Sequence, residues 1–298
     1  MKFGAFEIEE PIPELRSPHA FATLRPWVDV GSVGRLTFRS LERHFQAQDL
    51  AKLTRPGTFF DFTRYRPTIY TVEGQRQVTV PTVHVRFAHG PGENDFIFLH
   101  LLEPHLNGEG YVHSIVRLLE KFDVRRYCLI GAMYDLVPHT RPILVTGAAT
   151  GQDTLMNQVR SLGVHSSSYE GPTSIASLIS QEATKLGIET MGLIAHLPQY
   201  AQMDVDHTGR LRLLELLCKL YDFDMDLERV QMRAGQQNEE ISYAMNRSPE
   251  IRSLVEQLER QYEDRVRRLE EGRDEEDPEL SPEVQDFLNQ LGDQFSQN

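Results

Sequence analysis

The sequence has few cysteines and no long apolar run, and both shortages narrow the class of protein. Two cysteines, Cys128 and Cys218, occur in 298 residues. Neither has a CxxC or Cys/His spacing, so no disulfide framework or zinc motif is indicated. The longest apolar run, FIFLHLL at 96–102, is far too short to cross a bilayer, and the N-terminus has no signal-peptide core. We predict a soluble, cytoplasmic protein with reduced, buried thiols.

Positive charge is also scarce. Lysine and arginine number 31 against 44 aspartate and glutamate, which gives a net charge of −13. Such a chain is poorly suited to bind nucleic acid or an anionic membrane, and we predict neither partner. Part of the excess lies in residues 270–286, where nine acids stand against Arg273 alone. This composition is typical of a solvated linker.

Signature motifs of catalysis are missing as well. The sequence contains no GxSxG nucleophile elbow, and DVGSVG at 29–34 has the spacing GxxG in place of the dinucleotide fingerprint GxGxxG. Three histidines, His105, His139 and His196, follow predicted strands, but their spacing is not that of a metal site. We therefore predict no cofactor and no metal.

Alternating strand and helix patterns predict the fold. Runs such as 96–102 and RYCLIGAMY (126–134) lack polar alternation, as expected of strands buried on both faces of a parallel sheet. Helical patterns separate most of these runs. We predict an α/β fold, a three-layer α/β/α sandwich with a mostly parallel central sheet. Residues 68–87 differ, because two alternating runs around Glu73-Gly74 predict a hairpin added at a sheet edge.

The chain divides into an α/β core at 1–230 and a helical, acidic C-terminal extension at 231–298. In the extension, a stripe of apolar residues recurs at helical spacing. Its members are Ile251, Leu254, Val255, Leu258, Tyr262, Val266 and Leu269. A helix with this stripe packs against its own domain or against a neighbouring subunit. Further on, Ser281 and Pro282 predict the start of another helix.

Polar residues collect directly after the predicted strands, where parallel α/β sheets place their ligand-binding groups. One connector, VPHTRP at 137–142, is stiffened by Pro138 and Pro142; it is called the VPHTRP loop below. The candidates for a ligand-binding crevice at these strand ends are Asp29, Gly31, Glu103, His105, His139, Arg141, Glu170, Gly171, Thr173 and Tyr200.

Several of these residues have two interpretations. Arg141 either binds a carboxylate or phosphate or pairs with Glu170 or Glu103 and rigidifies the crevice; we favour the pairing. The turn before Thr173 either exposes helix amides to an anion or simply starts a helix. The segment FFDFTRYRP at 59–67 either stacks on a ligand or forms a subunit interface, and its aromatic and arginine content favours the interface.

Six motifs occur in the order WVDVG, DFTRYRP, EPH, VPHTRP, YEGPTSI and LPQY. This set, over residues 20–230, resembles the proteasome assembly chaperone 2 family, and bacterial-type members with a long helical C-terminus are most similar. The resemblance implies an α/β/α sandwich related to nucleoside phosphorylases and peptidyl hydrolases, and non-catalytic binding of proteasome subunits. Two positions depart from the family. Gln199 stands where its motif has histidine, and Gln297 where an archaeal docking tail has tyrosine.

Two functions remain open at this point. The first is a non-catalytic, homo-oligomeric assembly-chaperone-like protein with a protein partner, in which the VPHTRP loop is scaffold. The second is an enzyme, or a binder of a small anionic or nucleoside-like ligand, at the crevice. There Asp29 or Glu103 would act as base, His139 as proton donor, and Arg141 with the Thr173 amide as anion holders. The absence of a nucleophile or metal signature favours the first.

Overall fold

The apolar run at 96–102 forms β8 (Phe96–Leu102), which is buried along almost its whole length in this computed structural model. Its neighbour β3 (His19–Arg25) is buried nearly as fully. β3 pairs in parallel with both β8 and β9 (Arg126–Asp135). Strands covered on both faces are expected to lack polar alternation. The predicted α/β class with a central sheet is confirmed, and its central strands are parallel.

The structure describes residues 1–150, 153–167, 169–245 and 249–271, so the predicted helix start at Ser281 lies outside it. The chain forms two compact units. The first comprises Met1–Trp27, Ser40–Leu129 and Pro172–Met191, and the second comprises Val28–Arg39, Ile130–Gly171 and the described part of the chain from Gly192 onward. β9 and β13 (Glu189–Pro198) contribute residues to both units, as does α1 (Val33–His44).

Antiparallel strands flank the parallel centre of the first unit. From β8 outward the order is β7 (His84–Ala88), β4 (Gln48–Leu53), β2 (Phe6–Ile8) and β1 (Lys2–Phe3), with every neighbouring pair antiparallel. Two helices of this unit, α2 (Gly108–Lys121) and α4 (Ile175–Lys185), pack against each other. The buried face of α2 follows the helical period and consists of Tyr111, Val112, Ile115, Val116, Leu118 and Leu119.

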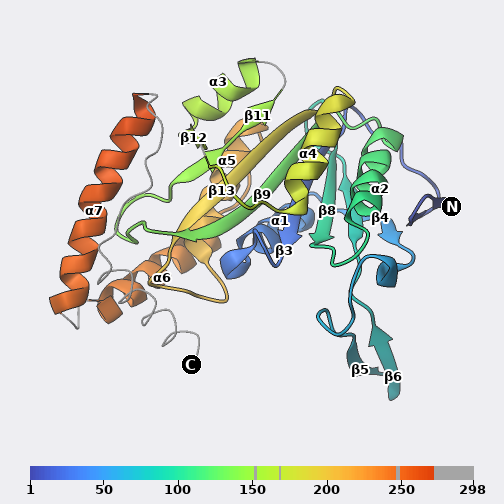
Figure 1. Cartoon of the computed structure of the whole chain (residues 1–298), viewed down its shortest axis with the longest axis horizontal. Helices are drawn as coiled ribbons and strands as arrows, with labels where there is room; N and C mark the ends of the chain where they lie inside the picture. Colours follow the sequence, from blue (N-terminus) through green and yellow to red (C-terminus); the bar gives the residue numbers. More distant parts are fainter. Residues whose placement is uncertain (151–152, 168, 246–248, 272–298) are drawn as a thin grey trace. The chain divides into compact units, whose positions relative to one another are not determined.

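The predicted hairpin forms, but not where the sequence placed it. β5 (Thr68–Val72) and β6 (Gln75–Thr79) pair with each other as a separate two-stranded sheet. Glu73 and Gly74 both have positive φ, +50° and +78°, as a tight type I′ turn requires. The prediction of an edge strand on the main sheet was wrong for this hairpin. Figure 1 shows it projecting away from β4 and β8.

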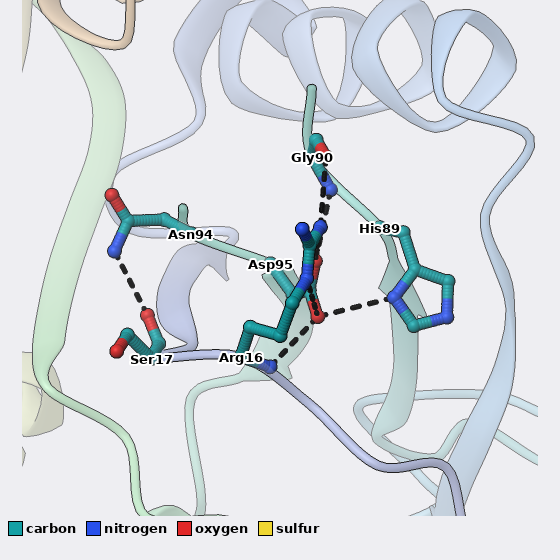
Figure 2. Close-up of polar contacts among 6 residues, drawn as sticks. All are labelled: Arg16, Ser17, His89, Gly90, Asn94 and Asp95. Atoms are coloured by element: carbon teal, nitrogen blue, oxygen red, sulfur yellow. Dashed lines mark hydrogen bonds and ion pairs between the residues drawn. The ribbon is translucent and has the colours of Figure 1, made fainter. Parts of the chain in front are cut away.

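Asp95, directly before β8, is a buried carboxylate that binds the segment before β3 (Figure 2). The side chain of Asp95 is fully buried and accepts hydrogen bonds from the Arg16 guanidinium at 2.7 Å, the Arg16 amide at 2.8 Å and the Gly90 amide at 3.1 Å. His89 Nδ1 lies 3.1 Å away. Burial alone would raise the pKa of Asp95, but the hydrogen bonds from Arg16, His89 and Gly90 together outweigh it and lower that pKa. Asp95 therefore ties residues 16 and 89–95 together as an ionised group.

In the second unit the strand order is β9, β13, β10 (Val145–Gly147) and β12 (Val164–Ser166). β10 runs parallel to β12 and antiparallel to β13. The short β11 (Ala149–Thr150) also pairs with β13, and α3 (Asp153–Ser161) leads into β12.

The described residues of the second unit form three further helices: α5 (His207–Leu220), α6 (Glu228–Met245) and α7 (Pro249–Glu270). α5 and α6 pack together. The apolar stripe predicted for α7 is confirmed at its N-terminal half, which is buried against α6 and the segment after β13. This core cluster consists of Tyr200, Ala201, Ile241, Met245, Leu254, Val255 and Leu258. In the described ranges, no helix is both long enough and apolar enough to cross a membrane.

Candidate functional site

The VPHTRP loop connects β9 to β10 and carries His139, whose ring is buried and hydrogen-bonded at both nitrogens. The Tyr200 hydroxyl accepts the backbone N–H of His139 at 2.7 Å and lies 2.7 Å from its Nδ1. Nε2 lies 3.0 Å from the Ser242 hydroxyl on α6. A neutral ring with its proton on Nε2 satisfies all three groups. Burial lowers the pKa of His139 and favours this form.

Arg141 of the same loop binds α7. Its Nη2 and Nε donate to Glu263 Oε1 at 2.7 and 3.1 Å, and its Nη1 donates to Glu259 Oε1 at 3.1 Å. The neighbouring Thr140 hydroxyl also donates to Glu259. Tyr262 completes the contact by donating to the Pro142 carbonyl at 2.9 Å. The salt-bridge role predicted for Arg141 is correct, but the predicted partners, Glu170 and Glu103, are wrong.

Four side chains of the second unit form a largely buried polar chain that ends on α7. The Thr146 hydroxyl lies 2.7 Å from His196 Nε2, and His196 Nδ1 lies 2.6 Å from Asp135 Oδ2. Arg265 donates to the same Asp135 oxygen at 2.5 Å. Burial raises the pKa of Asp135, but His196 and Arg265 outweigh it and hold the pKa far below its usual range. This carboxylate is therefore a fixed negative charge that attracts α7.

The spacing of Thr146, His196 and Asp135 is that of a hydroxyl–imidazole–carboxylate relay. All three side chains are largely buried, and the carboxylate of Asp135 is already bonded to Arg265. The sequence prediction included His196 as a connector residue, whereas the structure places it inside β13. It did not find Asp135, although an acid at the end of an apolar strand run is a readable signal.

Asp29 and Gly31 lie together at the turn before α1. Asp29 accepts from the Arg35 amide at 3.1 Å and from its Nε at 2.9 Å, while burial raises the pKa of Asp29. Gly31 has φ +57°, and a Cβ there would lie 2.7 Å from the Asp206 Cβ. Its carbonyl accepts the Asp206 amide at 2.8 Å. Both residues are therefore engaged in holding this turn.

Asp206 is a buried cap that the sequence prediction missed, although an aspartate directly before a helix is a standard N-cap signal. It accepts the Gly209 amide at 2.7 Å at the start of α5, and Gln237 of α6 donates to its second oxygen at 2.7 Å. The side-chain oxygen Oε1 of Gln237 in turn accepts a hydrogen bond from the His207 backbone amide at 2.7 Å. This pair joins α6 to the start of α5.

In the first unit, Glu103 follows β8 and accepts the Ile175 amide at 3.0 Å, which satisfies the N-terminus of α4. Burial raises the pKa of Glu103. His105 Nδ1 lies 3.3 Å from the Asp61 amide, and its ring centre is 4.5 Å from that of Tyr65. Thr173 is exposed, and its hydroxyl lies 2.6 Å from that of Ser177. Glu103 thus acts in the structure as a helix cap.

Glu170 and Gly171 are exposed in the second unit. The structure therefore brings His139 and Tyr200 into direct contact. His139 also contacts Ser242 of α6, and Arg141 binds Glu259 and Glu263 of α7. Asp29 and Gly31 lie together at one turn. A ligand-binding role for these residues stays a prediction. Among the described residues, no group of three or more histidines, cysteines or carboxylates is placed to hold a metal ion.

A cavity of about 490 Å³ lies inside the second unit, between the VPHTRP loop, α5 and α6. Its polar lining includes Arg141, Arg212, Glu215 and Asn238. Arg212 is half-buried, and its Nη2 donates to the Leu162 carbonyl at 3.0 Å. Burial lowers the pKa of Arg212. The cavity is large enough for a small ligand.

These features define an α/β protein whose central strands are parallel and whose helices α6 and α7 are bonded to a strand-end loop by polar side chains. The sequence profile of the PAC2 family matches residues 23–245, and the chain belongs to that family. The resemblance seen in the motifs is therefore confirmed. None of the curated proteins matches the chain.

Solved structures show the same fold. A PAC2 family protein from Streptomyces avermitilis is 24% identical with a TM-score of 0.71, and the match covers 80% of this chain and 99% of that one. A proteasome-assembly chaperone homologue from Mycobacterium tuberculosis is 23% identical, with a TM-score of 0.70 and coverage of 79% and 99%. An archaeal proteasome activator from Pyrococcus furiosus is 16% identical, with a TM-score of 0.62 and coverage of 80% and 97%.

Proposed function

We propose that this chain is a non-catalytic, homo-oligomeric, assembly-chaperone-like protein that binds subunits of a proteasome-type complex in the cytoplasm. Membership of the PAC2 family supports the proposal, as does structural likeness to a proteasome-assembly chaperone homologue and to a proteasome activator. Likeness of fold is weak evidence for any chemistry, and the bonding of the site residues is independent of it.

The observation that carries the proposal is the use made of the predicted crevice residues. His139 and Arg141, assigned to proton donation and anion binding in the enzymatic hypothesis, are bonded to Tyr200, Ser242, Glu259 and Glu263. The candidate base Glu103 caps α4. Groups engaged in this way hold helices in place, which is what a protein-binding scaffold needs from them.

The test uses purified chain and purified α-type and β-type proteasome subunits from the same host. Native mass spectrometry should detect a complex of the chain with one subunit type, and the rate of ring formation should change when the chain is added. An unrelated protein of similar net charge serves as the control. Absence of a complex together with an unchanged rate of ring formation would refute the proposal.

A second candidate function rests on the cavity of the second unit. A half-buried guanidinium on its wall favours a small anion such as phosphate or a dicarboxylate. Inorganic phosphate and succinate should then raise the melting temperature of the wild type and of an Arg233→Leu control, whose side chain is exposed on α6. Arg212→Leu should lose that shift. If neither anion shifts the wild type, this candidate fails.

A further inference from the structure

We propose that α7 is a displaceable internal ligand, and that the surface beneath it binds an amphipathic helix of a partner protein. This surface, called the α7 seat below, is formed by Asp135, Arg141, Pro142, Tyr200, Ile241 and Met245. The inference rests on the protein-binding part of the proposed function. It names the surface that receives the partner and the helix that regulates access to it.

The first half of α7 contacts the seat as a peptide helix binds a protein surface, through a few apolar anchors. These anchors are Leu254, Val255 and Leu258, which are buried against Tyr200 and Ile241. In the second half, no residue from 259 to 269 is buried. Three buried residues are few for a helix of 22 residues. A helix with a similar set of anchors can therefore compete for the seat.

The second half of α7 is held by polar contacts, and these define the chemistry of the partner. Glu259 and Glu263 are four residues apart, so they lie on one side of the helix, and both bind Arg141. The three side chains are 24%, 60% and 32% exposed. Partly exposed ion pairs contribute little affinity, but they select which helix binds and in which register. The partner helix should therefore carry two carboxylates four residues apart after its apolar anchors.

The fit of α7 to the rest of its unit is incomplete. Gln261 Oε1 is buried and has no hydrogen-bond partner in the described part of the chain. A buried polar atom without a partner costs free energy, so α7 binds its seat less tightly than a helix with an apolar residue at this position would. α7 also lies at the margin of its unit, beside the edge strand β12 (Figure 1).

A labelled peptide of residues 249–271 is the probe, and fluorescence anisotropy measures its binding to the full chain. In the wild type the docked α7 competes with the peptide, so only the open fraction of the molecules binds it. Leu254→Asp/Leu258→Asp, called the released variant below, removes the internal anchors and leaves the seat unchanged. It should bind the peptide about thirtyfold or more tightly than the wild type does.

The matched control is Arg252→Asp/Glu256→Asp. These two residues are exposed on α7, have the same spacing as Leu254 and Leu258, and undergo the same change in charge. The control should bind the peptide as the wild type does. Hydrogen exchange of β8 amides checks that each variant keeps its fold. Arg265→Met, which removes a contact of the internal helix to Asp135, is a second and milder releasing change.

A charge reversal tests whether the peptide occupies the seat itself. Arg141→Glu in the released variant should weaken peptide binding about tenfold or more. A peptide that carries Glu259→Lys and Glu263→Lys should restore it. Equal binding of the peptide by the wild type and both releasing variants, or binding that Arg141→Glu does not change, would overturn the inference.

Hydrogen exchange of the wild type tests whether α7 leaves its seat while the rest of the fold stays intact. The α7 amides should exchange at least about a hundredfold faster than the β8 amides. If both exchange at the same slow rate, α7 opens only with global unfolding, and the inference fails.

Adding the proteasome-type subunits separates this inference from the proposed function. In the complex, the α7 amides should lose protection about tenfold or more, because the partner helix replaces α7 on the seat. Subunits that bind while α7 stays protected would overturn the inference and leave the proposed function standing. A chain that binds the peptide as expected but binds no subunit would support the seat and refute the proteasome-type partner.

Discussion

Arg265 of α7 supplies the cation of the buried polar chain, and its replacement by methionine tests whether that contact holds the helix. Asp135 Oδ2 accepts from Arg265 at 2.5 Å, and the two side chains are 17% and 19% exposed. Methionine preserves the aliphatic part of the side chain and removes the charge. The variant therefore leaves Asp135 buried with His196 and its neighbouring amide at Leu136 as remaining partners.

Removing one partner of a buried ion pair typically costs about 3–5 kcal/mol, because the other charge stays buried without compensation. The remaining bonds of Asp135 put Arg265→Met at the low end, about 3 kcal/mol. Because the folded-state pKa of Asp135 is depressed, its contribution to stability is complete above the unfolded pKa of about 3.9 and is lost as pH falls through the folded value. At neutral pH the full effect should therefore be measured.

Urea unfolding at neutral pH gives the free energy, and hydrogen exchange shows where it is lost. If only α7 detaches, its amides should exchange about a hundredfold faster while those of β8 do not change. Arg267→Met is the matched control, because Arg267 lies on the same helix in an exposed pair with Asp264, with side chains 67% and 55% exposed, and should cost about 0.5 kcal/mol or less. Equal effects of the two variants would refute the reasoning.

Three other predictions test the remaining buried groups. Burial lowers the pKa of His19 to about 4, so stability is full above the unfolded pKa of about 6.5 and should be about 2 kcal/mol lower at pH 5. In urea unfolding His19→Asn should remove that loss and exposed His113→Asn should not. Gly31→Ala should cost about 3 kcal/mol by strain and by collision with the Asp206 Cβ, against about 1 kcal/mol for Gly4→Ala, which has a similar φ and open space; equal costs in thermal unfolding would contradict the collision. Burial raises the pKa of the Cys128 thiol, so mass spectrometry should find it unlabelled by iodoacetamide until the protein unfolds, and labelling in the folded state would disprove its burial.

Sequence by itself determined the elements that depend on local pattern. The uninterrupted apolar runs specified β8 and β9, because a strand that is buried on both faces carries apolar side chains on both of them. The helical spacing of Leu254, Val255 and Leu258 specified the buried face of α7. The alternating runs on either side of Glu73 and Gly74 specified a hairpin, and Gly74 adopts the positive φ of its turn without a Cβ penalty.

Only the tertiary structure decided which groups meet. Arg141 pairs with Glu259 and Glu263, more than a hundred residues away, although nearer loops offered carboxylates of the same kind. Every exposed acid is an equivalent partner for a guanidinium in the sequence, and the packing of α7 selects among them. The same holds for the β5–β6 hairpin. Its alternation predicts a ribbon, but whether that ribbon joins a sheet or projects from it depends on which strand edges the rest of the fold leaves open.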